Sequence, residues 1–269
     1  MSDFLLVTGL SLGAAALVMV ATAVAAARLG RVSVVDVAWG VALVAVALVC
    51  AVVAGTWQSW LLVGLVGIWG GRLSLHILRR SRGHGEDPRY EALLGGPLRE
   101  VGLGVAVRKV FLVQGAAVWL VSLPLQAAAL SSDLAAPAVL WVGVAVWLVG
   151  ILFEAVGDAQ LAAYKRDPDR GPVMDRGLWS WTRHPNYFGD ACVWWGIWLA
   201  GGLASGWVAG LVSLVAPVTM TVWLVWVTGA RLLERSMLQR PGYAAYAART
   251  SMFVPWPPRR GAGVSPGTR

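Results

Sequence analysis

The chain has 269 residues, of which 58% are hydrophobic and 13% charged, and it contains 16 tryptophans. Soluble domains carry about 25% charged residues, so this composition excludes an ordinary soluble protein. The net charge of +8 does not indicate nucleic-acid binding, because basic residues of membrane proteins record topology and contacts with anionic lipids. We therefore expect an integral membrane protein.

Seven apolar stretches are each long enough, at about 20 residues, to cross a bilayer as a helix. The first begins Met-Ser-Asp-Phe without basic residues, and its apolar run is too long for a cleaved signal peptide. The sequence shows no internal repeat, so an inverted-repeat transporter is not indicated. The sequence therefore predicts an all-α, polytopic membrane helix bundle with spans at 4–27, 34–55, 57–78, 107–130, 137–163, 186–205 and 208–232.

The distribution of lysine and arginine predicts the orientation of this bundle. Basic residues follow the first, third and fifth spans and the last one, whereas the connections after the second, fourth and sixth contain none. Because basic residues are enriched on the cytoplasmic side, we expect the N-terminus outside and the C-terminus in the cytoplasm of a plasma (inner) membrane protein. We expect one domain over 1–256, and a disordered tail over 257–269, which reads PPRRGAGVSPGTR.

Polar and ionisable groups within the predicted spans all lie near the cytoplasmic ends of their helices. Such groups are costly in a bilayer and usually face a cavity or a partner. Several are four residues apart, which places both side chains on one helix face. Each alone is explained by local pairing or by snorkelling to the interface, but their common depth favours a polar chamber open to the cytosol. The groups are Asp36, Arg72, His76, Gln114, Glu154, Asp158, Asn186, Asp190, Arg231 and Glu234.

The segment TRHPNYFGD places a polar cluster at the start of the sixth predicted span. Pro185 suits the first turn of a helix, where its missing N–H is not needed. A helix N-terminus beside Arg183 and His184 is an anion site, and Lys165 and Arg176 in the same loop add positive charge. The alternative for the loop arginines is the ordinary cytoplasmic bias. We expect an anionic, water-soluble ligand at this end.

Several other kinds of site are not indicated. No glycine-rich phosphate loop follows a predicted strand, so a nucleotide would be held without a Rossmann unit. Cys50 and Cys192 lie in apolar runs without the spacing of a zinc site or a disulfide framework. His76, His84 and His184 are in separate segments. We therefore expect no bound metal.

Two long stretches, with two shorter ones in keeping, resemble the DUF1295 branch of the steroid 5-alpha-reductase superfamily. The long ones read GLWSWTRHPNYFGDACVWWG and ARLLERSMLQRPGYAAYAARTSMFVPW, and the shorter ones VVDVAWG and RLSLHILRRSRGHGEDPRY. The resemblance implies a multi-span enzyme that uses NADPH, held in a polar cavity open to the cytosol. Its reaction would reduce a carbon–carbon double bond, conjugated to a carbonyl or sterol-like, in a lipid or steroid substrate.

The resemblance also implies roles for individual residues. Asp36 and Asp190 would be the catalytic groups, and a hydride would reach the β carbon while a proton donor polarises the carbonyl. Steroid reductases pair the acid of the second helix with a tyrosine on the third, where this chain has Trp69. An indole donates a hydrogen bond but is not an acid, so Asp36 or a water would supply the proton, or the substrate is not a 3-oxosteroid. The implied cofactor contacts are Arg72, His76, Glu154, Asp158, Lys165, Arg176, Asn186, Tyr187, Arg231, Arg235 and Tyr246. Arg183 and His184 of the predicted anion site complete the expected cofactor-binding residues.

Two alternative functions stay open. Methyltransferases of the isoprenylcysteine carboxyl type, which bind S-adenosylmethionine, also carry an Arg-His-Pro-x-Tyr element. Their Glu-Glu pair reads Glu234-Arg235 here, and the NYFGD continuation favours a reductase. A non-enzymatic lipid-binding or transport protein would also have a polar chamber, but basic clusters that face the cytosol fit it poorly.

Overall fold

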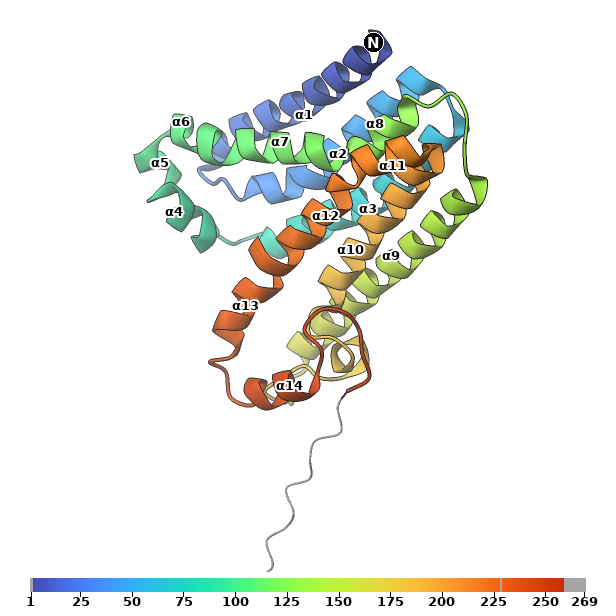
Figure 1. Ribbon diagram of the computed structural model, residues 1–269. Coiled ribbons are helices and arrows are strands. Elements are labelled where there is room, and N and C mark those ends of the chain that lie inside the picture. Colours follow the sequence, from blue (N-terminus) through green and yellow to red (C-terminus); the bar gives the residue numbers. More distant parts are fainter. Residues whose placement is uncertain (1, 228, 259–269) are drawn as a thin grey trace, which may run out of the picture. The chain divides into compact units, whose positions relative to one another are not determined.

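The computed structural model describes residues 2–227 and 229–258, and these residues are helical apart from loops and one isolated β-bridge between Thr182 and Ser251 (Figure 1). Most of the predicted tail, residues 259–269, lies outside the described part. The elements are α1 (Ser2–Leu29), α2 (Val34–Ala54), α3 (Trp57–Ser81), α4 (Pro88–Leu94), α5 (Leu98–Val101), α6 (Leu103–Ala106), η1 (Val107–Phe111), α7 (Leu112–Val121), α8 (Leu123–Ala129), α9 (Pro137–Arg166), η2 (Gly177–Ser180), α10 (Pro185–Ile197), η3 (Trp198–Gly202), η4 (Leu203–Ser205), α11 (Trp207–Ser213), α12 (Val215–Val222), η5 (Trp223–Val227), α13 (Ala230–Met237) and α14 (Tyr243–Arg249).

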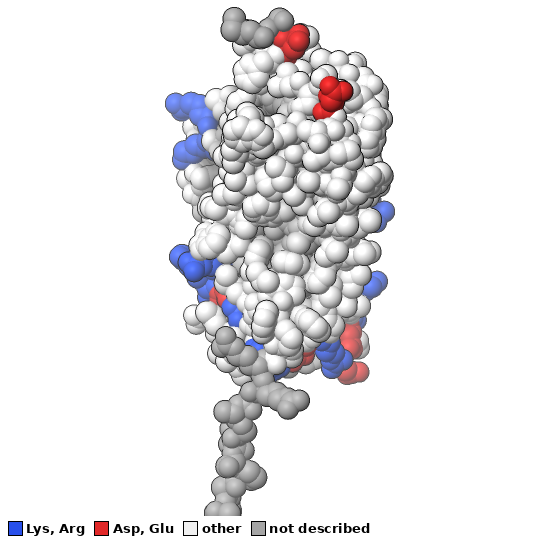
Figure 2. All heavy atoms as spheres, turned by 45° about the vertical axis from the view of Figure 1, so that its right-hand side comes forward, with Lys and Arg blue, Asp and Glu red and all other residues white. Residues whose placement is uncertain are grey.

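Six helical segments within the described residues are long and apolar enough to cross a membrane. Most of the face in Figure 2 carries no charged side chain, as expected of a surface in contact with lipid. The all-α, membrane-type fold predicted from the sequence is therefore confirmed. The six segments are Asp3–Leu29, Val34–Ala54, Trp57–Ser81, Leu103–Val121, Pro137–Arg166 and Trp207–Met237.

The predicted span 186–205 has no counterpart among these six segments. Residues 185–205 are helical throughout, but only α10 is an α-helix, followed by the π-helical η3 and the 3-10 helix η4. Hydropathy predicts the length of an apolar run but not its hydrogen-bond pattern, so the sequence did not indicate this change. The number of spans, the sides of the two termini and the identity of the membrane stay predictions.

The chain divides into two compact units. Unit 1 comprises Met1–Ala145 and Trp195–Pro217, and unit 2 comprises Val146–Trp194 and Val218–Arg269. The helices α9 and α10 each contribute residues to both units. That the two units act as the single domain predicted over 1–256 stays a prediction.

In unit 1, α2 packs against both α1 and α3, and α7 lies beside α1 and α2 (Figure 1). A close backbone approach joins α2 and α3, where a Cβ at Gly40 would lie 2.5 Å from the carbonyl oxygen of Gly70. The Ser74 hydroxyl donates to the Val37 carbonyl at 2.8 Å in the same interface. Small residues that let backbones approach this closely stabilise helix pairs in membranes. Trp69 of α3 is fully buried in this unit.

In unit 2, glycines bring α9 and α10 into similarly close contact. A Cβ at Gly189 would lie 2.6 Å from the amide nitrogen of Glu154 and 2.6 Å from the carbonyl oxygen of Gly150. Two turns further along α9, a Cβ at Gly157 would meet Pro185 at 3.2 Å. The glycines therefore set how closely the polar residues of the two helices approach one another.

Replacing Gly189 with alanine is expected to lower the free energy of unfolding by about 1–3 kcal/mol, because the added methyl group overpacks the backbone contact. Thermal denaturation of the purified protein in detergent measures the change. Gly64→Ala is the matched control, since a Cβ there meets nothing within 4 Å and helical alanine is favoured over glycine. Equal denaturation temperatures for the two variants would contradict the close packing of α9 and α10.

Candidate functional site

The predicted site residues are distributed over both units. Three of them, Asp36, Arg72 and His76, belong to unit 1. The others belong to unit 2, and they are Glu154, Asp158, Lys165, Arg176, Arg183, His184, Asn186, Tyr187, Asp190, Arg231, Arg235 and Tyr246.

Arg183 is held by one buried carboxylate and by the end of α14. Its Nε and Nη2 donate to the two carboxylate oxygens of Glu234 at 2.5 and 2.7 Å, and its Nη1 donates to the carbonyls of Ala247 and Thr250 at 2.7 Å. The His184 Nε2 lies 3.3 Å from the same Glu234 carboxylate. The guanidinium therefore joins the start of α10 to α13 and α14, and Glu234 balances its charge. Its role in anion binding stays a prediction.

The chain on either side of Arg183 is fixed by the segment that follows α14. The Arg183 amide donates to the Ser251 carbonyl at 2.9 Å, and the Thr182 hydroxyl donates to the Phe253 carbonyl at 2.8 Å. The helix α10 then begins at Pro185, and in its first turn the Phe188 amide donates to the His184 carbonyl at 3.0 Å. The helix start predicted at Pro185 is therefore confirmed.

Two tyrosines of α14 complete this cluster. The Tyr246 hydroxyl donates to the Trp179 carbonyl at 2.5 Å, and burial raises the pKa of this phenol. The Tyr243 hydroxyl donates to Glu234 at 3.4 Å, and burial, followed by the Glu234 charge, raises the pKa of Tyr243 to about 12. Sequence reasoning assigned Tyr246 to a cofactor and missed Tyr243, because no local pattern showed that both would pack around Glu234.

Polar side chains gather where α9 meets the first turn of α10. The Asn186 amide donates to the Asp158 carboxylate at 3.3 Å, and Glu154 is buried one turn before Asp158. The rings of His184 and Tyr187 are stacked, with centroids 5.5 Å apart. Polar groups on such apolar helices usually mark a functional site. Asp190 lies one turn beyond Asn186 and is half-buried.

A cationic cavity of about 250 Å³ lies at the junction of η5 and α13. The Arg231 guanidinium lies 5.7 Å from the centroid of the Trp226 ring, and Arg235 lines the same cavity one turn further along. Both arginines are exposed, and neither forms an ion pair with a carboxylate within residues 2–227 and 229–258. Lys165 and Arg176 are exposed as well. The cavity therefore presents two uncompensated guanidinium groups beside an indole.

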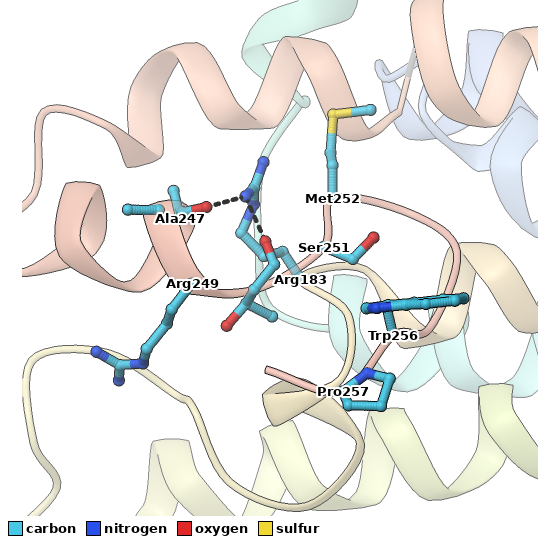
Figure 3. A pocket seen from close by; sticks show the side chains of 9 residues that line it. Arg183, Ala247, Arg249, Ser251, Met252, Trp256 and Pro257 are labelled. Carbon is cyan, nitrogen blue, oxygen red and sulfur yellow. Dashed lines mark hydrogen bonds between the residues drawn. The ribbon is translucent and has the colours of Figure 1, made fainter. Parts of the chain in front are cut away.

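A larger cavity, of about 430 Å³, lies beside Arg183 (Figure 3). Arg249 and Trp256 also line it, and Figure 3 shows the Arg183 bond to the Ala247 carbonyl. The Arg249 guanidinium pairs with Asp175 at 2.5 Å, just as Arg183 pairs with Glu234. Both cations of this cavity are therefore neutralised, which makes it a weaker anion site than the cavity of Arg231 and Arg235.

In unit 1, Asp36 is contacted by two residues of α4. The Tyr90 hydroxyl donates to its carboxylate, and Arg89 Nη2 lies 3.8 Å from the second carboxylate oxygen. The helix α4 begins after Asp87, whose side chain accepts from the Arg89 amide at 2.9 Å, with a proline in its first turn. Burial raises the pKa of the Tyr90 phenol, and the neighbouring Asp36 carboxylate raises it further. The phenol therefore stays protonated at neutral pH.

Sequence reasoning missed Tyr90 as a partner of Asp36. The sequence did indicate the helix that carries Tyr90, since Asp-Pro before Arg-Tyr predicts a helix start. It did not indicate the contact, because 54 residues separate Tyr90 from Asp36. Arg72 and His76 are half-buried one turn apart on α3, on a common face as predicted. Trp69 is fully buried.

The fold and these clusters define a helical, multi-span membrane protein with polar groups on otherwise apolar helices. The sequence pattern of the DUF1295 family, described as a protein of unknown function, matches residues 23–250. The chain therefore belongs to the DUF1295 family, as the sequence predicted. No curated protein and no solved structure matches the chain.

Proposed function

We propose that this DUF1295 protein is an integral membrane oxidoreductase that uses NADPH to reduce a carbon–carbon double bond in a lipid or steroid. The observation that carries the proposal is the cavity lined by Arg231 and Arg235 without a neutralising carboxylate, in which Arg231 lies over the Trp226 ring. NADPH differs from NADH by a phosphate on its adenosine, and paired guanidinium groups bind phosphate with directed, charge-assisted hydrogen bonds. NADPH supplies a hydride when it is bound.

The size and lining of this cavity suit one part of the cofactor. Its volume of about 250 Å³ lies below the roughly 300–1,000 Å³ of pockets that enclose a whole drug-sized ligand. A phosphate with its adjoining ring is a suitable occupant, because Arg231 already lies over the Trp226 ring and a guanidinium stacks on flat aromatic groups. Lys165 and Arg176, both exposed in unit 2, supply further positive charge for the cofactor's other phosphates.

The proposed reduction also requires a proton, and unit 1 contains a suitable pair of groups. Tyr90 has a neutral phenol at physiological pH, as an ordinary tyrosine does, and burial and Asp36 raise its pKa further, so it stays neutral at alkaline pH as well. Before substrate binds, its hydrogen bond to Asp36 holds the phenol in place; a substrate carbonyl that then replaces Asp36 as acceptor would receive the proton. A phenol is an acid whereas the Trp69 indole is not. We therefore assign the role of proton donor to Tyr90 and a positioning role to Asp36.

The alternative, an S-adenosylmethionine-dependent membrane methyltransferase, is favoured by one observation. Glu154 and Asp158 place carboxylates on α9, and carboxylates suit a ligand with a sulfonium and an ammonium group. Arg231 and Arg235 argue against it, because two uncompensated cations repel such a ligand. Ligand binding to the purified protein therefore distinguishes the two functions.

Thermal denaturation in detergent, measured with NADPH, NADH and S-adenosylmethionine, tests the proposal. Only a ligand that binds the folded protein raises its stability, by about 2.7 kcal/mol at a hundred times its Kd. Arg231→Gln and Arg235→Gln are each expected to weaken NADPH binding about 10–100-fold, since each removes a charged hydrogen bond to phosphate. Binding of NADH should change little in both variants.

Arg240→Gln is the matched control, because Arg240 is exposed and does not line the cavity. It should leave NADPH binding unchanged. Stabilisation by S-adenosylmethionine alone would contradict the reductase and favour the methyltransferase. Stabilisation by none of the three ligands would favour a lipid-binding or transport protein.

A further inference from the structure

Unit 1 contains an apolar groove that the proposed reaction does not use. This cavity of about 500 Å³ lies between α1, α2 and the last turns of α3. Apolar side chains line most of it. One polar residue, Thr22, lies along the wall, where its hydroxyl donates to the Val18 carbonyl of the same helix, and the other polar residues, Arg31, Ser33 and Ser81, lie next to the turn between α1 and α2. The groove therefore has an apolar body and a polar end.

Small residues on facing helices create the groove. Leu17, Ala21, Ala25 and Leu29 line it from α1, and their spacing of four places them on one helix face. Two of these four positions are alanine, and Ala38 faces them from α2. Because alanine has no atom beyond Cβ, it leaves space that a leucine would fill. From Leu17 to Leu29 the apolar wall extends roughly 18 Å along α1.

Arg31 is fixed at the polar end of the groove. Its Nη1 donates to the His84 carbonyl at 2.7 Å and to the Ser81 carbonyl at 3.3 Å. These acceptors are neutral carbonyls, so they orient the guanidinium without cancelling its charge.

Two further arginines add positive charge to the same turn. Arg28 is exposed in the last turn of α1, and the Arg99 guanidinium lies against Gly30, with its Nε 3.3 Å from where a Cβ would be. Glu86 also contacts this turn, but its carboxylate accepts hydrogen bonds from the amides of Val32 and Ser33. The end of the groove therefore carries more cationic than anionic side chains.

We propose that this groove binds one anionic phospholipid, with an acyl chain along α1 and α2 and the phosphate at the turn that holds Arg31. The apolar wall requires a long hydrocarbon chain, and the arginines require a net negative headgroup. Juxtamembrane basic residues attract anionic lipids in this way. The site uses residues of unit 1 alone and is independent of the proposed reductase activity.

Native mass spectrometry of the full-length protein, purified and delipidated in detergent, tests the site. The added probes are phosphatidylglycerol, phosphatidylcholine with the same acyl chains, and inorganic phosphate. One phosphatidylglycerol should stay bound, with at least about fivefold higher affinity than phosphatidylcholine, and phosphate should not stay bound. Equal retention of the two lipids, or retention of phosphate, would overturn the proposal.

Variants separate the apolar and the cationic parts of the site. Ala21→Phe fills the groove from an exposed position and should abolish retention of phosphatidylglycerol, whereas Val24→Phe, on another exposed part of α1, should keep it. Arg31→Gln should weaken binding about fivefold, and Arg31→Lys should restore most of it. Arg28→Gln tests the charge without disturbing the carbonyls that Arg31 holds, and Arg108→Gln is the control. Unchanged retention in Ala21→Phe, or in both glutamine variants at Arg31 and Arg28, would overturn the proposal.

Discussion

Tyr90→Phe is expected to lower the turnover of the proposed reduction about 10²–10⁴-fold, the usual contribution of a positioned general acid. The substitution removes the hydroxyl that donates to Asp36 and keeps the ring that packs in unit 1. Binding of NADPH should be unchanged. Single-turnover oxidation of NADPH with a panel of enone and sterol lipids measures the rate, and thermal denaturation measures cofactor binding.

The control for this variant is Tyr164→Phe, which removes a hydroxyl that donates to the Gly171 carbonyl at 2.5 Å in an exposed loop. It should leave the rate unchanged. Turnover of Tyr90→Phe equal to that of the wild type would remove Tyr90 from the reaction. A parallel loss of thermal stability in Tyr90→Phe would instead indicate that the Asp36 contact is structural.

The raised pKa of Tyr90 also predicts a pH dependence. The pKa of Tyr90 is higher in the folded chain than in the unfolded one. The neutral phenol therefore contributes its full share of the free energy of unfolding below the unfolded-state pKa of about 10. This stability is lost as the pH rises through the folded-state pKa. The turnover should therefore show no loss from ionisation of Tyr90 between neutral and mildly alkaline pH.

Replacing Glu234 with alanine is expected to lower the free energy of unfolding by about 3–5 kcal/mol, because it leaves a buried charge without its partner. The side chains of Arg183 and Glu234 are only 10% and 11% exposed. Thermal denaturation in detergent measures the loss. Replacing both residues with leucine should recover part of the stability, since an apolar pair avoids the unpaired charge.

The matched control is Asp175→Ala, which breaks the exposed pair with Arg249. The two side chains of that pair are 36% and 43% exposed, so the cost should be about 0–1 kcal/mol after solvent screening. A loss in Glu234→Ala no larger than in Asp175→Ala would contradict the view that Arg183 and Glu234 hold α10, α13 and α14 together.

The positions of the helices were largely predictable because they depend on local properties of the chain. The run from Val34 to Ala54 forms α2, and Gly55 ends it in the left-handed conformation before Thr56 caps α3. Helical spacing of four residues places Asp158 on the same face of α9 as Glu154, and Asn186 on the same face of α10 as Asp190. The span predicted at 186–205 corresponds to a run that is helical over residues 185–205. Its change from an α-helix to a π-helix at Trp198 was not predicted, because hydropathy does not encode the hydrogen-bond pattern of a helix.

The partners of the charged residues were not predictable from the sequence. Arg183 was expected to attract an anionic ligand, and the structure pairs it with Glu234, 51 residues away. Asp36 lacked its expected tyrosine on α3, and the structure supplies Tyr90 from α4. In both contacts the two residues are more than 50 positions apart in the chain and meet only because the chain folds back. No pattern in a single sequence indicates which distant residues will meet in this way.

The sequence by itself determined that this is a helical membrane protein of the DUF1295 family and where its apolar helices lie, because length, hydropathy and motif spacing are read along the chain. Only the tertiary structure decided which arginines are neutralised and which stay available. The interaction between two charges depends on their separation and burial, and packing brings Glu234 to Arg183 while leaving Arg231 and Arg235 exposed.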